Sequence, residues 1–264
     1  MRPNTLKDLW SSGRAAVNGW CAIPSSWSAE LMAHAGWDSV TLDLQHGLID
    51  YSTALPMLQA ISTTSTIPLA RVPWNEPGII MKLLDAGAYG IICPMINSRE
   101  ECERFVGACR YAPMGYRSNG PTRAVIYAGD DYQPNAADHI LTFAMVETGE
   151  AIKNLDAIVS TPGLNGVYVG PSDLSLSMQG KPRMDLRDDE MLPVLDAIAA
   201  ACKKYGVIAG IHCNDTDYAN FIIERGYQFV TIRSDGALLS AIAKQAVAAV
   251  KGAAAKATTS SGPY

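Results

Sequence analysis

The sequence predicts a single (β/α)8 barrel, and two observations support this fold. Eight short, mostly unbroken apolar runs alternate along the chain with helix-like stretches, and several of these stretches end in glycine, as helix C-termini often do. The length of 264 residues suits one such barrel. A doubly wound parallel sheet is the main alternative, and two smaller domains would also fit the length.

The predicted strands are apolar at consecutive positions, the pattern of parallel strands buried on both faces. They are Val17–Ile23, Ser39–Leu44, Ile67–Arg71, Gly90–Cys93, Leu141–Glu147, Gly166–Val169, Ile208–Ile211 and Phe229–Ile232. The stretches between them include "SAELMAHAG", "GIIMKLLDAGA", "REECERFVGACR" and "YANFIIERG", which have helical periodicity.

The chain is expected to form one domain followed by a short tail, and two of its segments stand out within this organisation. Residues 1–252 form the predicted barrel domain, and 253–264, which are small and polar, a flexible tail. The segment Ala112–Asp138 after the fourth predicted helix is expected to be irregular, and such long irregular connections are usually functional. The apolar, alanine-rich last helix suits burial against another subunit or against its own barrel.

Composition excludes several classes of protein. The chain is 48% hydrophobic and 18% charged, which is ordinary for a globular protein, and its net charge of −5 argues against nucleic-acid or anionic-membrane partners. No apolar run approaches membrane length. The six cysteines contain no CxxC pair, so the sequence predicts reduced thiols in a cytoplasmic protein.

Charged and imidazole side chains follow six of the predicted strands. Because parallel strands of a barrel end on one rim, these side chains are expected to converge where barrel enzymes carry their active sites. They are Asp43 and His46, then Arg71, Glu147, Asp173, His212 with Asp215, and Arg233 with Asp235.

Glu147 and Asp173 end neighbouring strands, and no thiolate lies near them in the sequence. Two carboxylates suit a hard divalent cation that keeps open positions for water and substrate. The alternatives are that Asp173 caps the helix that follows it and that Glu147 forms a salt bridge.

His46 lies in a loop three residues after Asp43, and an imidazole near a carboxylate is a candidate general base. Arg71 can clamp an oxyanion or form a structural salt bridge. His212 is a candidate substrate contact. No glycine-rich phosphate loop is present, so the sequence favours an unphosphorylated acid as substrate.

The stretches "TLDLQHGLIDY", "LARVPWNEPGIIMKLLDAGAYGIICPMINSREE", "VETGEAIKNLDAI" and "GVYVGPSDLSLSMQG" together resemble the HpcH/HpaI family of class II pyruvate aldolases, such as 2,4-dihydroxyhept-2-ene-1,7-dioic acid aldolase. The resemblance runs from about Leu6 to Val250. It implies a barrel that uses Mg²⁺, Mn²⁺ or Co²⁺ to hold the enolate of pyruvate. The implied reaction is reversible cleavage of a 4-hydroxy-2-oxo acid to pyruvate and an aldehyde.

The resemblance also implies roles for individual residues. Glu147 and Asp173 match the metal ligands, Arg71 the residue that contacts the keto oxygen, and His46 the general base. Asp85 matches an aspartate that supports this histidine from a neighbouring subunit. The backbone amides of Ser172 and Asp173 match the turn that holds the pyruvate carboxylate. Members form hexamers and often exchange the last helix, so a homohexamer is expected.

The sequence departs from other family members at three positions, and these departures leave the identity of the aldehyde substrate undetermined. Met114 replaces the first arginine of a "PRGxRG" run, Met145 stands where some members have glutamine, and His212 where some have an apolar residue. We expect Ala112–Asp138 to line the entrance and select the aldehyde. The alternatives to an aldolase are an acyl-CoA carbon–carbon lyase of the citrate-lyase type and a non-catalytic ligand-binding barrel.

Overall fold

Eight parallel strands close into a barrel in the order β1 to β8, which confirms the predicted fold. A computed structural model describes the backbone of residues 1–259 and the side chains of residues 1–251, and residues 260–264 lie outside the described residues. The strands are β1 (Ala16–Cys21), β2 (Ser39–Asp43), β3 (Ile67–Arg71), β4 (Gly90–Cys93), β5 (Leu141–Val146), β6 (Gly166–Val169), β7 (Ile208–Cys213) and β8 (Phe229–Ile232).

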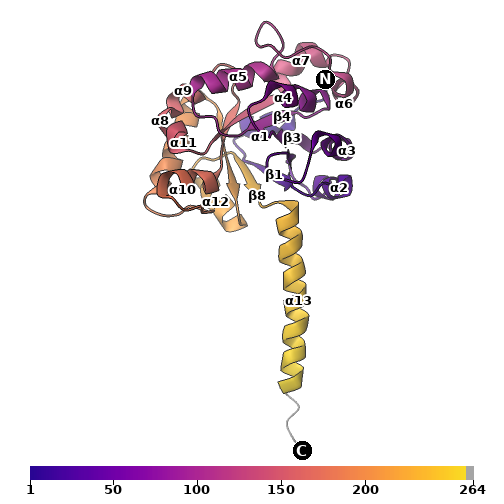
Figure 1. Cartoon of the computed structure of the whole chain (residues 1–264), viewed down its shortest axis with the longest axis vertical. Helices are drawn as coiled ribbons and strands as arrows, with labels where there is room; N and C mark the ends of the chain where they lie inside the picture. The colour runs from indigo at the N-terminus through magenta and orange to yellow at the C-terminus, as the bar shows by residue number, and fades with distance from the viewer. Residues whose placement is uncertain (260–264) are drawn as a thin grey trace, which may run out of the picture.

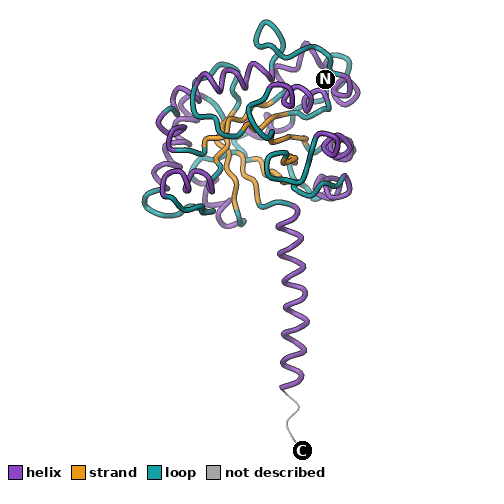
Figure 2. Tube along the Cα trace, viewed as in Figure 1, coloured by secondary structure: helices purple, strands orange, loops and turns teal. Residues whose placement is uncertain are grey.

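The helices surround the strands as an outer layer (Figure 2). They are α1 (Thr5–Ser11), α2 (Ser26–His34), α3 (Tyr51–Ile61), α4 (Pro77–Asp85), α5 (Arg99–Cys109), α6 (Thr122–Ala128), α7 (Tyr132–His139), α8 (Gly149–Lys153), α9 (Leu155–Val159), α10 (Pro171–Gln179), α11 (Met191–Tyr205), α12 (Thr216–Glu224) and α13 (Asp235–Thr259). Several of the helices begin at a polar N-cap residue. At α3, for example, the Asp50 side chain accepts a hydrogen bond from the Thr53 amide.

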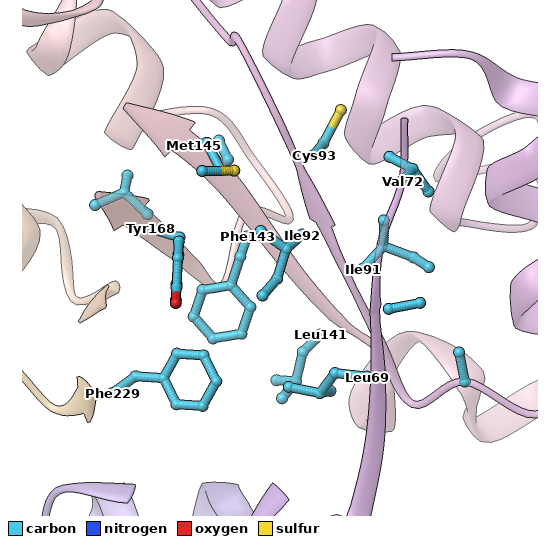
Figure 3. Packing of buried hydrophobic residues seen from close by; sticks show 14 of the residues in the cluster. Leu69, Val72, Ile91, Ile92, Cys93, Leu141, Phe143, Met145, Tyr168 and Phe229 are labelled. Carbon is cyan, nitrogen blue, oxygen red and sulfur yellow. The ribbon is translucent and has the colours of Figure 1, made fainter. Parts of the chain in front are cut away.

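Aromatic rings fill the barrel interior below the carboxyl ends of the strands (Figure 3). Phe143 and Phe229 stack with their centroids 5.0 Å apart, and Trp10 of α1 meets both rings edge-on at 6.1 Å. Tyr168 lies 6.0 Å from Phe229 and stacks on Trp20 at 5.8 Å. The barrel is therefore a packed core, and its upper aromatic residues form the floor of any site on the rim.

The segment Ala112–Asp138 is not irregular throughout, because it contains α6 and α7. Arg123 holds α6 against the end of α4 by donating to the Ala86 carbonyl and to the Ser62 hydroxyl. Figure 1 shows α6 and α7 beside the N-terminus, at the end of the barrel opposite to the start of α13. These helices are short and depend on tertiary contacts, which explains why the sequence pattern did not reveal them.

The last helix, α13, projects away from the barrel (Figure 1). Its apolar side chains Leu239, Ile242, Val247 and Val250 are more than half exposed. The helix continues to Thr259, so its backbone includes the first part of the expected tail. Among the described residues, no helix is both long and apolar enough to cross a membrane.

Candidate active site

Asp43 and Arg71 meet at the carboxyl ends of β2 and β3, where they are direct partners in the strand register. Arg71 Nε donates to Asp43 Oδ1 at 2.9 Å, and Arg71 Nη2 donates to Asp43 Oδ2 at 2.7 Å. Asp43 is only 3% exposed. Because this bidentate pair occupies one edge of the guanidinium, Nη1 is left without a hydrogen bond to the described residues and can reach a ligand.

Trp20, at the end of β1, supports the pair from below. Its Nε1 donates to Asp43 Oδ2 at 3.2 Å, and the Arg71 guanidinium lies 4.8 Å from the centre of its ring. Burial acts to raise the pKa of Asp43, but the hydrogen bonds and charge of Arg71 outweigh it and hold this pKa below its ordinary value. Asp43 therefore remains ionised and fixes the orientation of Arg71.

His46 is exposed at the same rim. Its backbone amide donates to Asp43 Oδ1 at 3.2 Å, whereas its imidazole makes no hydrogen bond with the described residues. Asp43 thus contacts the backbone of His46 and is committed to Arg71, rather than to the imidazole as the sequence spacing suggests.

Glu147 follows β5 directly and is 2% exposed. Its Oε1 accepts the Met95 amide at 2.8 Å, and Met95 has a left-handed backbone with φ of 55°. A Cβ on Gly170 would lie 2.3 Å from Glu147 Oε2, so glycine at this position leaves room for the carboxylate. Burial raises the pKa of Glu147 to about 7, the Met95 amide opposes this, and the charge of Asp173 adds to it.

Asp173 is the third residue of α10, whose N-cap is Gly170. The alternative in which Asp173 caps the helix is therefore wrong, and its exposed carboxylate acts on Glu147 through its charge. Glu147 has no ion-pair partner among the described residues, which removes the salt-bridge alternative. The first amide of α10 to bond within the helix is that of Leu174, so the amides of Ser172 and Asp173 are available to an anion.

The two acidic residues are a small donor set. No group of three or more His, Cys, Asp or Glu side chains that could hold a metal occurs in the described part of the chain. A pair of carboxylates, one of them held by a backbone amide, leaves several coordination positions for water and substrate oxygens, which is a common arrangement for Mg²⁺. Glu147 and Asp173 therefore fit a divalent cation of this kind.

His212 is the second-last residue of β7 and lies at the same rim. Its Nδ1 lies 3.1 Å from the Tyr168 hydroxyl, and its ring meets Trp20 edge-on at 5.2 Å. Burial lowers the pKa of His212 to about 4, and the charge of Arg71 lowers it further while Asp43 opposes the shift. The imidazole is consequently neutral at physiological pH.

Asp85 lies apart from this site. It ends α4, and a helix that follows a barrel strand runs back toward the amino ends of the strands, so Asp85 is at the rim opposite to His46. Arg117 Nη2 donates to Asp85 Oδ1 at 2.6 Å, and Tyr132 accepts from the same guanidinium at 2.9 Å. The structure does not bring Asp85 and His46 together within one chain.

A cavity of about 350 Å³ opens at the carboxyl-end rim, and it is lined by Asp43, His46, Arg71 and His212 among others. No residue of Ala112–Asp138 lines it, so this segment does not form the entrance in its own chain. A larger cavity of about 910 Å³ lies at the amino ends of β7 and β8 and contains none of the predicted site residues.

Sequence reasoning missed the residues that support the site. Trp20 and Tyr168 look like ordinary core aromatics in apolar strands, and only their positions near strand ends could have drawn attention to them. Met95 acts through its backbone amide, for which its side chain gives no signal.

Comparisons with known proteins identify the family of the chain. A model of the HpcH/HpaI aldolase/citrate lyase family matches residues 20–241. A hydroxypyruvate/pyruvate aldolase of Rhizorhabdus wittichii is 39% identical over 93% of this chain and 98% of its own length. A 4-hydroxy-2-oxo-heptane-1,7-dioate aldolase of Salmonella typhi is 34% identical over 99% of both chains.

A solved structure shows the same architecture. The HpcH/HpaI aldolase/citrate lyase family protein from Burkholderia cenocepacia has a TM-score of 0.87 and 28% sequence identity, over 94% of this chain and 99% of its own. With a family match across most of the barrel and full-length relatives above 30% identity, the chain belongs to the HpcH/HpaI aldolase/citrate lyase family.

Proposed function

We propose that this chain catalyses the reversible aldol cleavage of a 4-hydroxy-2-oxo acid to pyruvate and an aldehyde, with the help of a divalent cation. One observation carries the proposal: the Glu147–Asp173 carboxylates and the Asp43–Arg71 pair all lie at the carboxyl ends of strands in one parallel barrel, and therefore on the same rim. A cation site and an oxyanion-binding guanidinium are thus combined. Both full-length relatives named above are aldolases, which further supports this reaction.

Glu147 and Asp173 would hold the cation, which we expect to be Mg²⁺, Mn²⁺ or Co²⁺. When bound, the cation supplies Lewis-acid stabilisation of negative charge on the 2-oxo and carboxylate oxygens of the substrate. Arg71 would donate from Nη1 to the 2-oxo oxygen, where negative charge develops in the transition state. The amides of Ser172 and Asp173 would bind the substrate carboxylate at the positive end of α10.

In the cleavage direction, an imidazole nitrogen of His46 would accept the proton of the 4-hydroxyl group. The C3–C4 bond then breaks, the aldehyde carbonyl forms at C4, and the electron pair moves to the 2-oxo oxygen beside Arg71. His46 would then return this proton to C3 as the electron pair moves back from the oxygen, which completes pyruvate. Asp43 acts in this scheme as a positioning residue, because it touches Arg71 and not the substrate.

We also propose a symmetric homo-oligomer, most simply a hexamer, in which α13 packs on a neighbouring protomer. Its half-exposed apolar side chains and its projection from the barrel support exchange of this helix. Asp85 could reach a His46 imidazole only from another protomer, since the two lie at opposite rims of one chain. Sedimentation showing a fully active monomer would overturn the shared site.

A cytoplasmic location is supported by six cysteines that are all buried and unpaired.

The deciding experiment is a screen of the metal-loaded protein for pyruvate release from 4-hydroxy-2-oxo acids, with an acyl-CoA thioester in the same panel. We expect release from the hydroxy-oxo acids, loss on chelation, and recovery with Mg²⁺ or Mn²⁺. Glu147→Gln should abolish release, whereas Glu150→Gln, an exposed glutamate on α8, should not. Cleavage of the thioester alone, or full activity after exhaustive chelation, would reject the proposal.

A further inference from the structure

The rim cavity is offset from the predicted cation site. It is lined by Asp43, His46, Arg71, His212 and Arg233, whereas Glu147 and Asp173 do not line it. The proposed function requires pyruvate to bind at the cation held by Glu147 and Asp173 and at the start of α10. This cavity is then the space left for the second substrate. Its volume of about 350 Å³ is in the range of small-molecule sites.

The cavity carries one positive charge without a counter-ion. Three lining residues are aspartate or arginine: Asp43, Arg71 and Arg233. Asp43 is matched by its bidentate bond to Arg71, and Arg233 forms no ion pair with the described residues. His212 adds no charge, because burial and Arg71 lower its pKa to about 4. An anion that enters the cavity would therefore meet an unmatched guanidinium.

Arg233 is held in place at the end of β8. Its backbone has φ of 53°, a left-handed conformation that glycine adopts more readily than arginine. Its amide donates to the Cys213 carbonyl at 3.0 Å, and its Nε donates to the Asn214 carbonyl at 2.6 Å. These bonds fix the half-buried side chain and leave Nη1 and Nη2 without partners among the described residues. Unfavourable backbone geometry at a site rim is a recurrent sign of function.

Nearby acidic groups are committed elsewhere. Asp235 accepts the amides of Ala22 and Gly236 and the Ser28 hydroxyl. Asp185 accepts the Asn214 amide at 2.7 Å and does not line the cavity. Arg233 lines the cavity, and its Nη1 and Nη2 have no partners among the described residues, so its guanidinium is available to a planar anion there.

We propose that Arg233 binds a carboxylate on the second substrate, so that the enzyme prefers carboxylate-bearing aldehydes over neutral aldehydes of the same chain length. The planar guanidinium, held through Nε, can bind a carboxylate through its two Nη atoms. The inference rests on the proposed aldolase function and adds the chemical class of its acceptor.

The test separates the two claims by beginning without any aldehyde. Metal-loaded protein is incubated with pyruvate in D2O, and exchange of the pyruvate methyl protons is followed by NMR. Absence of exchange would reject the proposed function itself. Exchange shows that the pyruvate half-reaction operates, and selectivity for the aldehyde can then be judged separately.

Selectivity is measured as kcat/KM for aldol addition with matched pairs: glyoxylate against glycolaldehyde, and succinic semialdehyde against butanal. Because these aldehydes differ in intrinsic reactivity, the deciding quantity is how the ratio changes on substitution. Arg233→Gly, which suits the left-handed backbone, should lower the ratio about 10- to 100-fold, the scale of one charge-assisted contact. Arg233→Lys keeps the charge but not the fork, and should give an intermediate ratio.

Arg187→Ala is the matched control, because it removes one exposed arginine outside the cavity and changes the net charge equally. It should keep the wild-type ratio. Thermal denaturation of each variant verifies the fold. An unchanged ratio in folded Arg233→Gly, with exchange of pyruvate protons retained, would overturn the inference, as would an equal decrease in Arg187→Ala.

Discussion

Replacing Asp43 by asparagine tests whether the buried pair with Arg71 anchors the site. An asparagine can still accept the Gln45 and His46 amides through its oxygen. Its NH2 group, however, would face two donors, Arg71 Nη2 and Trp20 Nε1, which lie 2.7 Å and 3.2 Å from Asp43 Oδ2. The substitution therefore removes the carboxylate charge, breaks two hydrogen bonds and leaves a guanidinium without its counter-ion.

The magnitude follows from burial. Breaking a buried ion pair costs about 3–5 kcal/mol, and the lower end applies here because the Arg71 side chain is 12% exposed. We expect Asp43→Asn to lower the free energy of unfolding by about 3 kcal/mol and the thermal midpoint by roughly 6–12 °C, given roughly 2–4 °C per kcal/mol for large domains. Loss of a correctly oriented oxyanion donor should lower kcat about 10²-fold.

The assays are urea and thermal unfolding monitored by circular dichroism, with pyruvate release measured in parallel. Asp50→Asn is the matched control, because Asp50 is an exposed N-cap whose role asparagine performs equally well. It should change the unfolding free energy by less than about 0.5 kcal/mol. If Asp43→Asn changes stability no more than this control does, the reasoning that Asp43 anchors Arg71 is wrong.

Three other substitutions give distinct readouts. Gly170→Ala should weaken metal affinity about 10-fold or more without unfolding the barrel, because the new Cβ would displace Glu147 Oε2. Isothermal calorimetry measures the metal affinity, and an unchanged affinity would contradict this prediction. His46→Ala should lower kcat about 10²-fold and change pyruvate affinity little, and the reverse pattern in steady-state kinetics would reassign His46 to binding. His212 has its folded pKa lowered to about 4, so it takes up a proton less readily than in the unfolded chain. The contribution of neutral His212 to the free energy of unfolding is therefore fully present above a pH of about 6.5 and is lost as the pH falls toward 4. This loss lowers the free energy of unfolding by about 2 kcal/mol after allowing for partial exposure. His212→Gln should show a flatter decline of unfolding free energy between pH 7.5 and 4.5, and a decline equal to wild type would exclude this role.

The sequence by itself determined the barrel and the rim on which the site lies. Unbroken apolar strands have to be buried on both faces, and alternation with helices makes the strands parallel, so their charged ends share one rim. The bounds of Ile67–Arg71, Gly90–Cys93, Gly166–Val169 and Phe229–Ile232 were predicted at both ends. Family resemblance added roles that the residues alone did not assign, such as those of Ser172 and Asp85.

Only the tertiary structure decided which of these groups touch. Asp43 is three residues from His46 in the chain, yet its carboxylate forms an ion pair with Arg71, because the parallel register places the ends of β2 and β3 side by side. The Met95 amide on Glu147 and the open edge of Arg233 depend on left-handed backbone conformations, for which neither side chain gives a signal. Contacts between strands depend on register and loop geometry, and these are set by packing of the whole barrel rather than by local sequence.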